Sequence, residues 1–156
     1  MRLWPELLRR GAVNITPLGA DELPEVSALL AANGLPVADL SPAIHFLGVR
    51  DDRGLEGIVG LERLDADGLL RSLAVRPDRR GSGLGSALVL EVERLARVGG
   101  LRALYLLTTT AEEFFAHRGY GRIAREDAAA AIRQSSEFAS LCPATAVVMR
   151  KVLHGG

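Results

Sequence analysis

The stretch VRPDRRGSGLGSALV, residues 75–89, constrains the fold of this 156-residue chain more than any other. An apolar, strand-like run (LLRSLAV) leads into it, and apolar residues at helical spacing follow it. Glycine lets the backbone turn tightly and lets a ligand approach the main chain, and a helix start offers unpaired N–H groups and a positive dipole end. Five residues of this stretch favour the binding of an anion: Arg79, Arg80, Gly81, Gly83 and Gly85. We therefore expect a strand, an anion-binding loop and a helix in succession.

The patterning of the remaining chain predicts an α/β fold in one domain over residues 1–156. Turn chemistry in DDRG and LDADG predicts an antiparallel meander of three strands before the glycine loop. We expect strands near residues 13–17, 43–52, 55–64, 69–75, 101–109 and 145–153. We expect helices near residues 21–34, with Asp21 as the cap, and near residues 84–100, 111–120 and 126–140.

Net charge and cysteine content restrict the partners. Nineteen basic and nineteen acidic residues cancel, so bulk attraction to nucleic acid or to an anionic membrane is not expected, and any anion site must be local. The single cysteine, Cys142, excludes an internal disulfide and a multi-cysteine metal site, and no metal is expected. No apolar run approaches the ~20 residues that span a bilayer. These features predict a cytoplasmic protein.

Two familiar phosphate-binding loops do not fit the glycine stretch. A kinase-type loop requires Lys-Ser or Lys-Thr where the helix begins, and this chain has neither there. A dinucleotide loop can be written as Gly81-x-Gly83-x-x-Ser86, but several residues separate it from the strand end. It also lacks the acidic residue expected ~20 positions further on. The segment Arg80–Gly85 instead matches Arg/Gln-x-x-Gly-x-Gly/Ala and resembles the pyrophosphate loop of the GNAT family of N-acetyltransferases.

The resemblance to GNAT proteins extends over residues 13–152. The stretch TTTAEEFFAHRGY resembles the family pattern Asn-x-x-Ala-x-x-x-Tyr-x-x-x-Gly-Phe, with these residues in its positions: Thr108, Ala111, Phe115, Gly119 and Tyr120. The resemblance implies a mixed, mostly antiparallel sheet that is flanked by helices and splayed between its fourth and fifth strands. It implies acetyl-coenzyme A as cosubstrate, bound by Leu73, Ala74, Val75, Arg80, Gly81, Ser82, Gly83, Leu84, Gly85, Ser86, Thr108 and Phe115.

The resemblance also suggests where the chemistry takes place. The main-chain N–H of Leu73 would stabilise developing oxyanion charge. Glu62 is our candidate for the base that deprotonates the amine; the alternative is a solvent-exposed carboxylate at a strand end. Arg71 and Ser72 would line the acceptor pocket; the alternative for Arg71 is a surface arginine. Phe115 stands where many members have a proton-donating tyrosine, so the group that protonates the thiolate is not identified, and Tyr120 aligns with a packing aromatic.

Three functions are compatible with this pattern. The first is acetylation of a small amino acid-like amine. The segments LLRSLAVRPDRRGSGLG and EFASLCPATAVVMRK resemble the arsenic-resistance-associated N-acetyltransferases, whose relatives acetylate glutamate-like toxins. The second is acetylation of a protein N-terminus or lysine. The third is a non-catalytic module that senses acetyl-coenzyme A. The family resemblance is also compatible with a homodimer.

Overall fold

The structure is a computed structural model that describes residues 14–35, 37–38, 40–41, 43–138 and 146–153. Within these residues the strands form one mixed sheet in the order β1-β2-β3-β4-β5-β7-β6. The strands are β1 (Thr16–Pro17), β2 (Ile44–Asp51), β3 (Gly54–Leu64), β4 (Asp67–Val75), β5 (Ala103–Thr108), β6 (Gly121–Ile123) and β7 (Val147–Val152). The helices are α2 (Leu23–Ala32), α3 (Leu84–Val98), α4 (Glu112–Ala116) and α5 (Ala130–Arg133).

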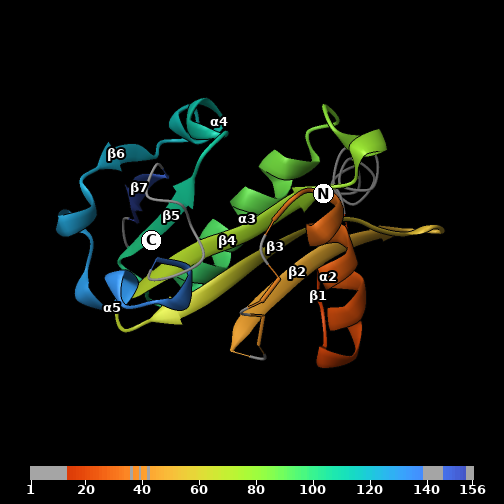
Figure 1. Cartoon of the computed structure of the whole chain (residues 1–156), viewed down its shortest axis with the longest axis horizontal. Coiled ribbons are helices and arrows are strands. Elements are labelled where there is room, and N and C mark those ends of the chain that lie inside the picture. Colours follow the sequence, from red (N-terminus) through yellow and green to blue (C-terminus); the bar gives the residue numbers. More distant parts are fainter. Residues whose placement is uncertain (1–13, 36, 39, 42, 139–145, 154–156) are drawn as a thin grey trace, which may run out of the picture. The chain divides into compact units, whose positions relative to one another are not determined.

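The chain divides into two compact units, and β3, β4 and α3 each pass from one to the other. The first unit comprises the chain up to Gly60 together with Ser72–Val92. In it, α2 lies beside β1 and β2 (Figure 1) and buries Val26, Leu29 and Leu30 against the strands. Successive strand residues face opposite sides. Ile58 therefore joins the α2 core, while a Cβ at Gly57 would touch Leu84 and Leu88 of α3.

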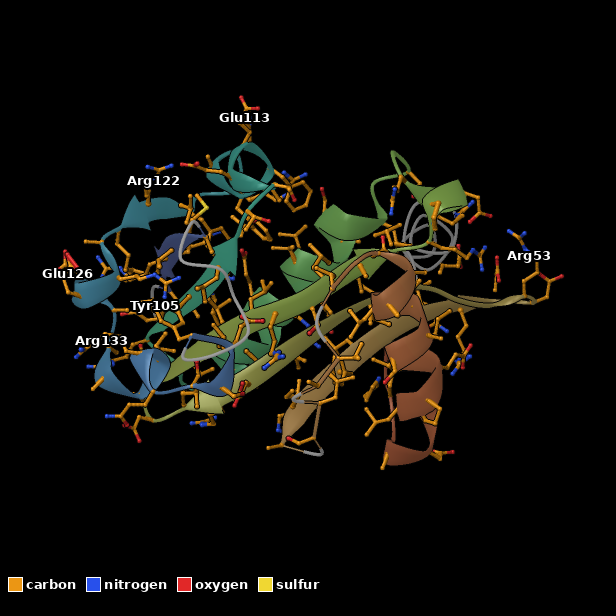
Figure 2. The ribbon with its side chains drawn as sticks, viewed as in Figure 1. Arg53, Tyr105, Glu113, Arg122, Glu126 and Arg133 are labelled. Carbon is orange, nitrogen blue, oxygen red and sulfur yellow. The ribbon has the colours of Figure 1, made fainter. Side chains whose placement is uncertain are left out.

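The second unit comprises Leu61–Arg71 and the chain from Glu93 onward. Strand β5 runs antiparallel to β7 along its whole length, from Ala103–Val152 to Thr108–Val147, and β6 pairs with the other side of β7 (Figure 1). Leu104 and Leu106 are buried on one face of β5. Tyr105, labelled in Figure 2, is buried on the other face, in a core with Ile132 of α5. This double burial confirms that the apolar run is a strand covered on both faces.

Strands β4 and β5 pair in parallel over two residue pairs, Gly68–Leu104 and Leu69–Tyr105. Both pairs lie near the N-terminal ends of the two strands. The C-terminal segment of β4, Ser72–Val75, is therefore not part of this parallel ladder. The β1–β2, β5–β7 and β6–β7 pairings are antiparallel, so the sheet is mixed. The predicted fold class is therefore confirmed.

Three local predictions were wrong. Asp21 lies inside a 3₁₀ turn, Ala20–Glu22, and makes no cap; the Glu22 side chain accepts a hydrogen bond from the Gly19 N–H instead. The described part of the expected helix, residues 126–138, is not one helix. It contains the end of a 3₁₀ turn (Arg125–Asp127) and the four-residue α5, and the helical backbone breaks at Gln134 and Ser135 before it resumes at Ser136. At the break the Ser135 hydroxyl donates to the Ile132 carbonyl and accepts from the Phe138 N–H. Strand β6 was not predicted, because three residues are too short for a period-two pattern.

Ser72 has a left-handed backbone within β4, at φ 59°. A non-glycine residue with positive φ inside a strand is strained and marks a local kink in the extended backbone. Nothing in the sequence LLRSLAV indicates this kink, since serine has no special preference for such a position.

Replacing Ser72 with threonine is expected to lower the free energy of unfolding by ~1–3 kcal/mol, because a β-branched residue tolerates positive φ poorly while the hydroxyl is retained. Replacement with glycine is expected to leave stability unchanged or raise it. Denaturant unfolding of both variants checks this. Equal stability of the two variants would contradict a left-handed residue at this position.

Candidate functional site

The glycine loop has the geometry that an anion site requires. Gly81 and Gly83 have φ of 80° and 88°, the left-handed region that favours glycine. A Cβ built at either glycine meets no atom within 4 Å, so these glycines are not needed for packing against the described residues. The first helical hydrogen bond of α3 runs from the Ala87 N–H to the Gly83 carbonyl, at 3.1 Å. The N–H groups of Leu84 and Gly85 precede it, in the first turn, where N–H groups have no partner within the helix.

The arginines before the loop differ in their partners. Arg76 contacts Asp51 at 2.5 Å and Asp78 at 2.7 Å, and Arg79 contacts Glu56 at 2.7 Å. The Arg80 guanidinium donates to the amide oxygen of Asn33, which is neutral. The sequence predicted that both Arg79 and Arg80 contribute charge at the loop. The structure shows that Arg79 is paired with a carboxylate, whereas Arg80, which is exposed, donates to a neutral group.

Asp78 ties the segment before the loop to the β2–β3 hairpin, where Arg53 marks the tip in Figure 2. Hydrogen bonds from Arg76 and then from Arg53 lower the pKa of Asp78 from 3.8 to about 2. The folded-state pKa lies below the ordinary value, so the ionised carboxylate stabilises the fold above pH ~3.8, and this contribution is lost as the pH falls toward 2.

The variant Asp78→Asn is therefore expected to be less stable than the original chain at neutral pH. The difference should shrink as the pH falls from 3.8 to 2 and disappear below the folded-state pKa, because Asp78 is then protonated in both the folded and the unfolded chain. Urea unfolding measured across this range checks the prediction. Asp52→Asn, at an exposed position of the same hairpin, serves as the matched control. A difference as large at pH 2 as at neutral pH would contradict the ion pair as its cause.

The β4 segment that follows Ser72 supplies main-chain groups next to the loop in sequence. Ala74 is buried, while Leu73 and Val75 are half-buried. The strand ends where the Arg76 N–H donates to the Glu56 carbonyl at 2.7 Å. The predicted cofactor residues of β4 and of the loop therefore lie in one compact unit, separated in sequence by residues 76–79.

Glu62, Arg71 and Glu137 form a buried ionic cluster in the second unit. The Arg71 side chain is 1% exposed, with Nη1 at 3.3 Å from Glu62 Oε1 and Nε at 3.8 Å from Glu137 Oε1. Arg71 is thus not the surface arginine considered as an alternative, and Glu62, at 18% side-chain exposure, is not a freely solvated carboxylate. The sequence did not point to Glu137, because it lies in the segment where one long helix was expected.

The residues after β5 pack around aromatic rings. Thr108 Oγ1 accepts hydrogen bonds from the main chain of Thr110 and Ala111, which fixes the turn before α4. Phe115 is buried, edge to face with Tyr120 at 5.4 Å between ring centres. Tyr120 donates to the buried Glu93 at 2.9 Å, and burial, reinforced by Glu93, raises its pKa. Tyr120 is therefore a packing residue, as predicted, and it stays protonated at neutral pH.

No cluster of three or more His, Cys, Asp or Glu residues that could hold a metal occurs among the described residues, and Cys142 lies outside them. Within the same residues, no helix combines the length and apolarity needed to cross a membrane.

Comparisons with known proteins give a consistent result. The acetyltransferase (GNAT) domain matches residues 42–122, just over half of the chain. The amino-acid acetyltransferase of Ectopseudomonas mendocina (strain ymp) is 44% identical over 57 residues, which are 36% of this chain and 13% of that protein. The match thus spans about an eighth of the curated relative.

Solved structures share the fold. The N-acetylglutamate synthase of Neisseria gonorrhoeae, complexed with coenzyme A and N-acetyl-glutamate, superposes with a TM-score of 0.76 at 23% identity, over 91% of this chain and 35% of that one. A GNAT-family acetyltransferase of Staphylococcus aureus Mu50 gives 0.74 at 17% identity, over 92% of this chain and 100% of that one. With the family's domain matched over most of the sheet and its loop geometry present, the chain belongs to the GNAT family of acetyltransferases.

Proposed function

We propose that this domain transfers the acetyl group of acetyl-coenzyme A to the amine of a small, amino acid-like acceptor. The observation that carries the proposal is the glycine loop at the head of α3. Gly81 and Gly83 are left-handed and open to an approaching ligand, and main-chain N–H groups follow at the helix start. A diphosphate fits such a cradle, because its charge is matched by helix-end N–H groups.

The cofactor residues divide by the part of acetyl-coenzyme A that they bind. The main chain from Gly81 to Ser86, including Ser82, Leu84 and Gly85, holds the pyrophosphate, and Arg80 adds a positive charge at the exposed edge. The main chain of Leu73, Ala74 and Val75 pairs with the pantetheine arm as an additional strand would. Thr108 and Phe115 are proposed as further contacts from the family pattern alone.

The reaction places simple demands on the protein. The acceptor must lose a proton before its nitrogen attacks the thioester carbon, since lysine-like amines have a pKa near ~10.4. Glu62 accepts that proton. The Leu73 N–H donates to the carbonyl oxygen as negative charge develops there and as the carbon–sulfur bond breaks. The nitrogen gives up a second proton as the amide forms, and water carries it to the departing thiolate, because Phe115 has no proton to give and Tyr120 is bonded to Glu93.

An amino acid-like acceptor is favoured by the relatives. The curated match is an amino-acid acetyltransferase, and a neighbouring structure holds N-acetyl-glutamate. By the family resemblance, Arg71 and Ser72 would lie on the acceptor side. The resemblance to arsenic-resistance-associated N-acetyltransferases extends the proposal to glutamate-like toxins that carry arsenic or phosphorus.

A thiol-release assay with acetyl-coenzyme A and a panel of amines tests the proposal. The panel contains glutamate, its phosphorus-containing analogue phosphinothricin, further amino acids, and peptides with free N-termini. We expect turnover with small carboxylate-bearing amines. Turnover with peptides alone would favour the protein acetyltransferase. Saturable cofactor binding without turnover on any amine would favour the sensor.

A further inference from the structure

Arg71 is buried and paired with two carboxylates of the protein, and this pairing bears on its role in the reaction. Its guanidinium is always charged and its side chain is 1% exposed, so it requires compensating carboxylates. Glu62 lies at 3.3 Å on one side of the guanidinium and Glu137 at 3.8 Å on another. The three groups come from β3, from β4 and from the segment after α5, and all belong to the second unit.

The two carboxylates are not equivalent. Glu137 is the more deeply buried, with 9% of its side chain exposed, whereas Glu62 is 18% exposed. Water and an amine therefore reach Glu62 more readily than Glu137. Arginine presents several N–H donors in one rigid plane, so a single guanidinium can contact two carboxylates at once. Here Nη1 contacts Glu62 and Nε lies near Glu137, so that Arg71 links the two carboxylates.

We propose that Arg71 is a positioning residue, which, anchored by Glu137, holds the Glu62 carboxylate in the orientation from which it accepts the proton of the acceptor amine. The inference rests on the proposed function, because it assumes that Glu62 is the base. In this role Arg71 does not bind the carboxylate of the acceptor. It influences the reaction only by orienting Glu62. One acetyl transfer still moves one proton from the amine to Glu62.

The test is a double-mutant cycle on purified full chain, read by kcat and KM. Arg71→Met is expected to lower kcat by ~10²-fold, the scale of a misplacement of ~1 Å, with KM nearly unchanged. In a Glu62→Gln background, Arg71→Met is expected to add little further loss, because the group that it positions is already disabled. Arg71→Lys should recover part of the activity, and Glu137→Gln should give a smaller loss in kcat. Arg102→Met, which breaks the Arg102–Asp67 pair of the same unit, should leave kcat unchanged.

Three results would overturn the proposal. Independent losses that multiply in the double variant would show that Arg71 does not act through Glu62. A loss confined to the KM of acceptors with a carboxylate, absent for an amine such as glycinamide, would show that Arg71 binds the acceptor itself. The third readout does not depend on activity: in a crystal structure of Arg71→Met, the Glu62 carboxylate should leave its present orientation, and an unchanged position would refute the role. If the original chain acetylates no amine, the proposed function fails, and this structural readout still decides the positioning role.

Discussion

Replacing Gly83 with leucine is expected to weaken binding of coenzyme A by at least ~10²-fold. Gly83 opens the first turn of α3, and a side chain there projects into the open space where the pyrophosphate is proposed to lie. Loss of one or two hydrogen bonds to a charged group, each worth ~1.5–3 kcal/mol, accounts for this magnitude. Isothermal titration calorimetry with coenzyme A measures the change.

Gly100→Leu is the matched control for Gly83→Leu. Gly100 also has a left-handed backbone, at φ 79°, and a Cβ there also meets no atom of the described residues within 4 Å. Both variants should therefore lose similar stability from backbone strain. Only the Gly83 variant should lose affinity. If Gly83→Leu binds coenzyme A as tightly as the original chain does, the loop does not bind the pyrophosphate. Both the enzyme hypothesis and the sensor hypothesis would then be wrong.

Replacing Glu62 with glutamine is expected to lower kcat by ~10²–10⁴-fold, the usual contribution of a general base. Glutamine keeps the size of the side chain and its capacity to accept a hydrogen bond from Arg71, but it cannot take up the proton. Affinity for coenzyme A, measured by calorimetry, should not change. The loss should be smaller for glycinamide than for glutamate, because an amine of lower pKa needs a base less.

Glu112→Gln is the control for Glu62→Gln, because Glu112 is also paired with an arginine, Arg122, at 2.9 Å. It should leave kcat unchanged. If Glu62→Gln also retains full kcat, Glu62 is a strand-end carboxylate with no part in the chemistry, and deprotonation must take place elsewhere.

Most of the regular elements could be predicted because their signals are local. The apolar run Ala103–Thr108 and the spacing of Leu84, Leu88 and Val92 identify a buried strand and an amphipathic helix without reference to distant residues. The single helix expected over residues 126–140 was wrong for the described residues 126–138. Its alanines favour a helix, but the helix is interrupted at Gln134 and Ser135, where the Ser135 hydroxyl bonds to the neighbouring backbone. A sum of helix propensities over a stretch of sequence does not include hydrogen bonds that a side chain makes to the backbone in place of the helical pattern.

The sequence by itself determined the anion loop, because a left-handed backbone at Gly81 and Gly83 and the helix that follows depend on adjacent residues. The tertiary structure alone decided the charges around it. Whether an arginine meets a carboxylate, as Arg79 meets Glu56, or a neutral amide, as Arg80 meets Asn33, depends on elements that are remote in the chain. The same holds for Arg71, whose partner Glu137 is brought to it only by the folded core, since the energy of a buried charge is set by what surrounds it in space.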